Sequence, residues 1–139
     1  MKNPRILVID GQGGRIGQQL IEGLRARLPE AELLAIGTNS SATAAMMKAG
    51  ASRGATGENA MIVNARRASL IIGPLGIVVA DSMLGEISPA MAAAVGQSEA
   101  KKLLIPINLC NNSVVGAAGL PIKELIRQAV EEAVLYCEA

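Results

Sequence analysis

The sequence of 139 residues has no histidine, tryptophan or phenylalanine, and a single tyrosine. Histidine is the commonest metal ligand and proton shuttle in proteins, so its absence excludes a Ser-His-Asp triad and a histidine-ligated zinc site. We expect no metal site. Because aromatic side chains on which bases stack are almost absent, we expect no nucleic-acid partner. Acid–base chemistry, if there is any, falls to carboxylates, a thiol, lysine or a bound cofactor.

An excess of charge of one sign is missing as well, because 13 basic and 12 acidic residues leave a net charge of +1 and no basic block. This balance is a second argument against nucleic acid. The longest uncharged apolar run, residues 68–80, contains a Gly-Pro pair and is shorter than the roughly 18–20 residues that a membrane span needs. The chain also reaches Asp10 too early for a signal peptide. We therefore expect a cytoplasmic protein that does not enter a membrane.

Short apolar runs alternate with amphipathic or small-residue segments along the chain. The pattern predicts strands near 5–9, 31–39, 52–55, 69–74 and 101–108, and helices near 16–28, 41–49, 58–67, 89–97 and from 121 onward. Residues 76–85 fit neither pattern. Such alternation predicts a parallel sheet with helices on both sides, and the length fits one domain. We expect a single Rossmann-like α/β domain over residues 1–139: three layers around an open parallel sheet of about five strands, ordered 3-2-1-4-5 by analogy.

The segment "DGQGGRIG" joins the first predicted strand to the first helix. Gly11 would allow a tight turn, and Gly13 or Gly14 would let a pyrophosphate approach backbone N–H groups at the helix N-terminus. Gly17 would let the helix pack closely on its strand. The glycine spacing at this position predicts a nucleotide site. The cofactor-binding residues predicted here are Gly11, Gln12, Gly13, Gly14, Arg15, Ile16 and Gly17.

A structural role without any ligand is the alternative interpretation of the glycine-rich segment. The glycines can serve strand-to-helix packing alone, without any ligand. Asp10 places a carboxylate beside the turn, and it would repel a phosphate unless it points away, holds a ribose hydroxyl or binds Mg²⁺.

The stretch "GQGGRIGQQLIEGL" resembles the cofactor turn of dihydrodipicolinate reductases, whose Gly-x-x-Gly-Arg-Met-Gly pattern binds a nicotinamide dinucleotide. Four positions match, with Ile16 in place of Met: Gly11, Gly14, Arg15 and Gly17. The match ends there, since the histidine-containing segment and the second domain of those enzymes are missing. Over nearly its full length, through "IDGQGG", "GTNSSATAAMMKAGASRGATGEN", "IIGPLGIVVADSMLGEISPAMA" and "KKLLIPINLCNN", the chain resembles a bacterial family catalogued only as domain of unknown function 3842. That resemblance implies a Rossmann-like fold and no assigned activity.

Polar or glycine-rich residues follow all five predicted strands, where ligands of parallel sheets collect. After the second strand, "GTNSS" takes the place of the acid that usually holds the ribose of NAD. Its side chains, with Arg15, fit a 2′-phosphate, so NAD(P) is the expected cofactor and NADP is slightly favoured; helix capping is the alternative. The further cofactor-binding residues predicted on this rim are Thr38, Asn39, Ser40, Gly73, Pro74 and Asn108.

Candidates for catalysis are few. Asp81 and Glu86 are the only carboxylates of an otherwise apolar stretch, where either is a candidate acid or base. Glu58 follows the third strand near a helix start, where helix capping is the favoured explanation of it.

Two functions fit the sequence. The first is a nucleotide-binding protein that carries out redox chemistry on a small-molecule ligand, with a homodimer closing the open crevice. The second is a sensor or regulatory module that binds a mononucleotide or a phosphorylated metabolite without turning it over.

Overall fold

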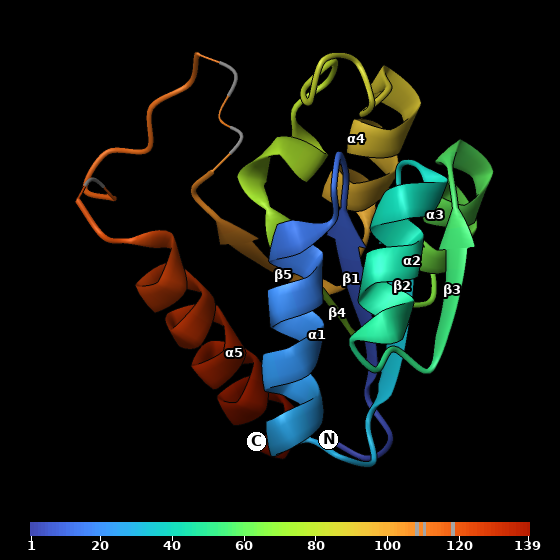
Figure 1. The fold of residues 1–139 in the computed structure, drawn as a ribbon, viewed down its shortest axis with the longest axis vertical. Coiled ribbons are helices and arrows are strands. Elements are labelled where there is room, and N and C mark those ends of the chain that lie inside the picture. The colour runs from blue at the N-terminus through green and yellow to red at the C-terminus, as the bar shows by residue number, and fades with distance from the viewer. Residues whose placement is uncertain (108, 110, 118) are drawn as a thin grey trace.

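The structure is a computed structural model that describes residues 1–107, 109, 111–117 and 119–139. Its centre is a five-stranded, all-parallel sheet in the order β3-β2-β1-β4-β5 (Figure 1). The strands are β1 (Arg5–Asp10), β2 (Glu32–Gly37), β3 (Arg53–Thr56), β4 (Leu70–Pro74) and β5 (Lys101–Ile105). The predicted α/β class, the parallel sheet and the strand order are therefore confirmed.

Helices cover both faces of this sheet, because each parallel crossover needs a connecting segment that packs back on the strands. The helices are α1 (Arg15–Arg27), α2 (Ser40–Lys48), α3 (Glu58–Ala65), α4 (Pro89–Gln97) and α5 (Ile122–Glu138), with a short 3-10 helix η1 (Leu75–Val78). Helices α1, α2 and α5 lie on one face and α3 and α4 on the other (Figure 1). Among the described residues, no helix has the length and apolarity that crossing a membrane requires.

Strand β1 lies in the middle of the sheet and is buried on both faces. Ile6 and Val8 belong to the core under α1 and α5, whereas Leu7 and Ile9 belong to the core under α3 and α4. The strand order reverses between β1 and β4, so the carboxyl end of β1 opens on the crevice where ligands of such sheets bind.

Several boundaries follow local signals in the sequence. Asn39 caps α2 by accepting a hydrogen bond from the N–H of Ala42 at 2.9 Å. Ser88 caps α4 ahead of a proline at the first helical position, as predicted. β5 is an edge strand and ends before Pro106. Residues 76–85, which match no periodic pattern, form part of η1 and then an irregular loop.

Candidate functional site

The candidate site lies where β1 ends, and it is built on residues 11–14, the glycine turn. Asp10, the last residue of β1, is buried and faces the start of α1. One carboxylate oxygen accepts the N–H of Gly11 at 2.8 Å and the other accepts the N–H of Gly17 at 2.7 Å. Burial raises the pKa of Asp10 more than these backbone N–H groups lower it. A side chain of the protein therefore satisfies donors that the helix N-terminus leaves unpaired.

Packing constraints explain two of the glycines. Gly14 has a φ of 74°, and a Cβ there would lie 2.8 Å from the Cα of Ala42 in α2. A Cβ on Gly17 would lie 2.4 Å from the sulfur of Met46, so this glycine lets α1 approach its neighbours closely. Gly14 therefore has to be glycine whether or not a ligand is bound, and Gly17 has a packing role that is likewise independent of a ligand.

The site also has an open part, formed by Gly13 of the glycine turn and Arg15, the first residue of α1. Both residues are exposed, and a Cβ on Gly13 would meet no atom within 4 Å. Within the described part of the chain, no group accepts a hydrogen bond from the N–H of either residue. Two backbone donors and one guanidinium group are therefore available to an anion at the N-terminus of α1.

A second carboxylate, that of Glu86, lies on the glycine turn. One of its oxygens accepts hydrogen bonds from the N–H of Gln12 at 2.7 Å, the hydroxyl of Thr38 at 2.5 Å and the amide of Asn39 at 3.2 Å. Partial burial acts to raise the pKa of Glu86, but these three donors outweigh it and hold the pKa below its ordinary value. An ionised carboxylate thus takes donors that a phosphate would also use.

Glu86 comes from the loop of residues 79–87, which lies at the same end of the sheet as the glycine turn (Figure 1). The N–H of Asp81 donates to the carbonyl of Ile87 at 2.7 Å and closes the loop. Three non-glycine residues adopt positive φ, a costly conformation: Asp81, Met83 and Leu84. Met83 is buried against Gly11, whereas Leu84 is 98% exposed. The loop is thus held by its two ends and by Met83.

The other predicted residues are dispersed. Thr38 and Asn39 lie in the site, and the Asn39 amide also donates to the carbonyl of Gln12 at 2.9 Å. Ser40 is exposed at the start of α2, and Ile16 is half-buried in α1. Asn108 lies outside the described residues.

Gly73 and Pro74 are both buried. A Cβ on Gly73 would lie 2.4 Å from the carbonyl oxygen of Ile9, so its close neighbour is the backbone of β1. Of the catalytic candidates, Glu86 alone contacts the glycine turn. Asp81 is exposed, and Glu58 accepts a hydrogen bond from the hydroxyl of Ser88 at 2.5 Å.

Sequence reasoning named Glu86 but did not place it. Its isolation among apolar residues was the signal that singled it out. Nothing in the neighbouring sequence indicates that its hydrogen-bond partner lies in the glycine turn. The described part of the chain contains no group of three or more histidine, cysteine, aspartate or glutamate side chains arranged to hold a metal ion.

Comparisons with known proteins identify a family but no activity. A search of curated protein sequences finds no significant match. Among solved structures, the chain is similar to a universal stress protein determined in complex with cAMP, with 17% identity and a TM-score of 0.42 over 73% of this chain and 97% of the other. The model of one family, described as domain of unknown function DUF3842, matches residues 5–138. The chain therefore belongs to that family.

Proposed function

We propose that this protein binds a nucleotide through its phosphate groups at the glycine turn. The observation that carries the proposal is the pair of N–H groups of Gly13 and Arg15, two exposed residues, which have no hydrogen-bond partner among the described residues. They lie at the N-terminus of α1 and at the point where the strand order reverses. Backbone donors and the helix dipole favour an anion at this position. Gly13 leaves space for it, since no atom lies within 4 Å of where its Cβ would be.

Binding requires that Glu86 leaves the turn. Two unit charges 4 Å apart repel each other by about 4 kcal/mol at an effective dielectric constant of 20. A phosphate and the Glu86 carboxylate therefore compete for the N–H of Gln12 and the hydroxyl of Thr38. Glu86 keeps these donors paired in the free protein and the ligand displaces it.

Within this proposal, a nicotinamide dinucleotide is the first candidate ligand, with NADP slightly ahead of NAD. The segment that follows β2 supplies no acid of its own to hold a ribose hydroxyl pair, and the acid that reaches it, Glu86, is the one that the ligand displaces. The hydroxyl of Ser40 and the guanidinium of Arg15 are both exposed. Hydroxyls and a cation suit a 2′-phosphate. The redox role follows only if a dinucleotide binds.

A regulatory module without turnover is the second candidate, and the hydrogen bonding of the two carboxylates favours it. Both oxygens of Asp10 accept backbone N–H groups, and one oxygen of Glu86 accepts three donors. In this arrangement both oxygens of Asp10 are occupied, and Glu86 becomes available as a general base only when it leaves the turn. In this form of the proposal the ligand is a mononucleotide or a phosphorylated metabolite.

The test is a titration of the protein with NADP, NAD, ATP and AMP, followed by thermal shift and calorimetry. A ligand at 100 times its dissociation constant adds about 2.7 kcal/mol to the free energy of unfolding. We expect the variant Gly13→Leu to lose binding while it keeps the fold, because its Cβ has space but its side chain fills the anion position.

Gly96→Leu is the matched control, since Gly96 also has no atom within 4 Å of a Cβ and lies in α4. It should bind like the unmodified protein. Tighter binding of a dinucleotide than of AMP would support the first candidate, and the reverse would support the second. Unchanged nucleotide affinity in Gly13→Leu would refute the placement of the phosphate.

A further inference from the structure

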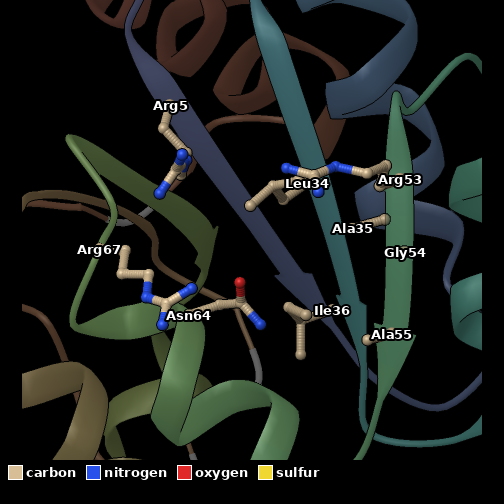
Figure 2. A pocket seen from close by; sticks show the side chains of 9 residues that line it. All are labelled: Arg5, Leu34, Ala35, Ile36, Arg53, Gly54, Ala55, Asn64 and Arg67. Atoms are coloured by element: carbon tan, nitrogen blue, oxygen red, sulfur yellow. The ribbon is translucent and has the colours of Figure 1, made fainter.

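A cavity of about 370 Å³ lies on the face of the sheet that carries α3, and no residue of the glycine turn lines it. Figure 2 shows that the side chains of Arg5, Arg53 and Arg67 surround it, while Leu34 and Ile36 of β2 lie between them. Arg5 begins β1, whereas the glycine turn follows the end of that strand. At about 3.3 Å per residue, the two ends of β1 are roughly 16 Å apart, so the Arg5 end of the cavity is well separated from the glycine turn. Ile36, which pairs with Ile9 of β1, marks the end of the cavity that lies nearer to the turn.

The cavity exists because the sheet is incompletely covered at its β3 edge. Every residue of β3 is exposed. Gly54 faces α2, where a Cβ would lie 2.8 Å from the sulfur of Met47. The alternation of side chains in a strand therefore turns Arg53 and Ala55 to the opposite face, above the apolar side chains of β2. Helix α3 covers only part of this area.

The charges around the cavity do not balance. Glu32 pairs with Arg5 at 3.2 Å and also with Arg53. Hydrogen bonds from Arg53 and Arg5 hold the pKa of Glu32 below its ordinary value, so it is ionised at neutral pH. The guanidinium of Arg67 has no partner within the described residues. The guanidinium groups of the three arginines are therefore balanced by the Glu32 carboxylate alone. This leaves an excess of two positive charges beside the apolar side chains of β2 that line the cavity.

We propose that this cavity is a second binding site, for a small organic phosphate ester. Its phosphate would lie among the three guanidinium groups, with Arg67 as the unpaired donor, and its apolar body would rest on Leu34 and Ile36. A phosphate monoester carries about −1.5 to −2 charges at pH 7, which matches the excess, and guanidinium groups bind phosphate oxygens in a bidentate manner. The cavity volume falls in the range of about 300–1,000 Å³ that small-molecule sites occupy.

Asn64 supplies the polar group that such sites place beside an apolar surface. Its amide nitrogen donates to the carbonyl of Ala60 at 2.8 Å, which fixes the side chain in α3. Its amide oxygen, with no partner in the described part of the chain, is free to accept a hydrogen bond from a ligand hydroxyl or amine.

The experiment is a titration of the full chain with phenyl phosphate, followed by amide chemical shifts in NMR. We expect saturable shifts at Ala35, Gly54 and Ala55, and a loss of affinity of about tenfold or more in Arg67→Gln, because a charged bidentate contact is removed. Arg66→Gln is the matched control: it removes the same charge one residue away, from a side chain that does not line the cavity.

Benzoate and inorganic phosphate form the two further arms of the titration. Both should bind more weakly than phenyl phosphate, since benzoate lacks the second charge and inorganic phosphate lacks the apolar body. Gly13→Leu should leave these shifts unchanged, which separates the two sites. Equal weakening by Arg66→Gln and Arg67→Gln, shifts confined to the glycine turn, or benzoate binding as tightly as phenyl phosphate would each overturn the proposal. If the amide spectrum shows that the Arg67→Gln variant is unfolded, Arg67→Lys is used instead. This variant should also lose affinity for phenyl phosphate, because a lysine ammonium group lacks the planar pair of N–H donors with which a guanidinium binds two phosphate oxygens.

Discussion

The carboxylate of Glu86 accepts a hydrogen bond from the backbone N–H of Gln12 at 2.7 Å, across 74 positions of the chain. This contact ties the irregular loop after β4 to the turn after β1. It also places a negative charge where the proposed phosphate would bind, so under the proposal the ligand would replace Glu86 as the partner of the Gln12 N–H.

Removing the charge of Glu86 should strengthen nucleotide binding. The variant Glu86→Gln keeps an oxygen that accepts from Gln12 but ends the repulsion, and we expect the affinity for a bound nucleotide to rise about tenfold or more. Calorimetric titration measures this change. Glu99→Gln, which removes the same charge at an exposed position, is the control and should change little. Weaker binding in Glu86→Gln would mean that this carboxylate contacts the ligand directly.

Neighbouring glycines of the turn should differ sharply in how they tolerate a methyl group. Gly14→Ala forces a side chain into a φ of 74° and against the backbone of Ala42. We expect a loss of about 2 kcal/mol or more in the free energy of unfolding. Gly13→Ala meets no atom within 4 Å and should stay within about 0.5 kcal/mol of the unmodified protein. Urea denaturation measures both values, and equal losses would contradict this account of the turn.

The fold was predictable because its signals are local and repeated. Buried runs such as that of β1 and the caps at Asn39 and Ser88 lie within a few residues of the elements that they define. Together with the rule that parallel crossovers are right-handed and need a covering helix, they predict the layers and the parallel sheet, whereas the strand order was predicted by analogy.

The arrangement of the site was not predictable in the same way. Glu86 reaches Gln12 through a loop whose sequence has neither helical nor strand periodicity. Asp81, Met83 and Leu84 adopt positive φ in this loop, which their residue types do not predict. The arginine cavity likewise depends on the register of separate strands, since Arg53 pairs with Leu34 of β2. Such long-range relationships follow from tertiary packing, which a single sequence does not encode in any short window.

Arg25 in α1 is a structural residue that the sequence pattern does not reveal. Its guanidinium donates to the carbonyls of Gly50 at 3.1 Å, Pro29 at 3.0 Å and Ala31 at 2.9 Å, and also to the hydroxyl of Ser52. Its hydrogen bonds therefore hold together the α1–β2 connection and the α2–β3 connection.

Arg25→Lys should destabilise the fold by about 1–3 kcal/mol, because an ammonium group keeps the charge but does not reproduce the planar fork of donors. Chemical denaturation measures the loss. The matched control is Arg66→Lys, since the Arg66 side chain has no hydrogen-bond or ion-pair partner in the described part of the chain, and it should stay within about 0.5 kcal/mol. A loss in Arg25→Lys no larger than in the control would show that these four hydrogen bonds contribute little.

The buried carboxyl of Asp10 should make stability depend on pH in an unusual direction. Its pKa in the folded protein is raised above the ordinary value of 3.8, mainly by burial and with a further contribution from the charge of Glu86. Between the ordinary and the folded pKa the folded protein holds more protons at this site than the unfolded chain, so stability falls as pH rises. The contribution of Asp10 is therefore fully present below the ordinary pKa and is lost as pH rises through the folded value. Most paired carboxylates act in the opposite sense.

Asp10→Asn isolates this effect because it cannot titrate and keeps an oxygen for one of the two N–H groups. We expect the free energy of unfolding of the unmodified protein, minus that of Asp10→Asn, to decline as pH rises through the folded pKa of Asp10 and then to become constant. Denaturation series at matched ionic strength from about pH 3 to pH 7 measure this difference. A difference that rises with pH would mean that the N–H groups of Gly11 and Gly17 outweigh burial. The start of α1 would then stabilise a negative charge more strongly than this geometry indicates, which would strengthen the case for an anion beside it.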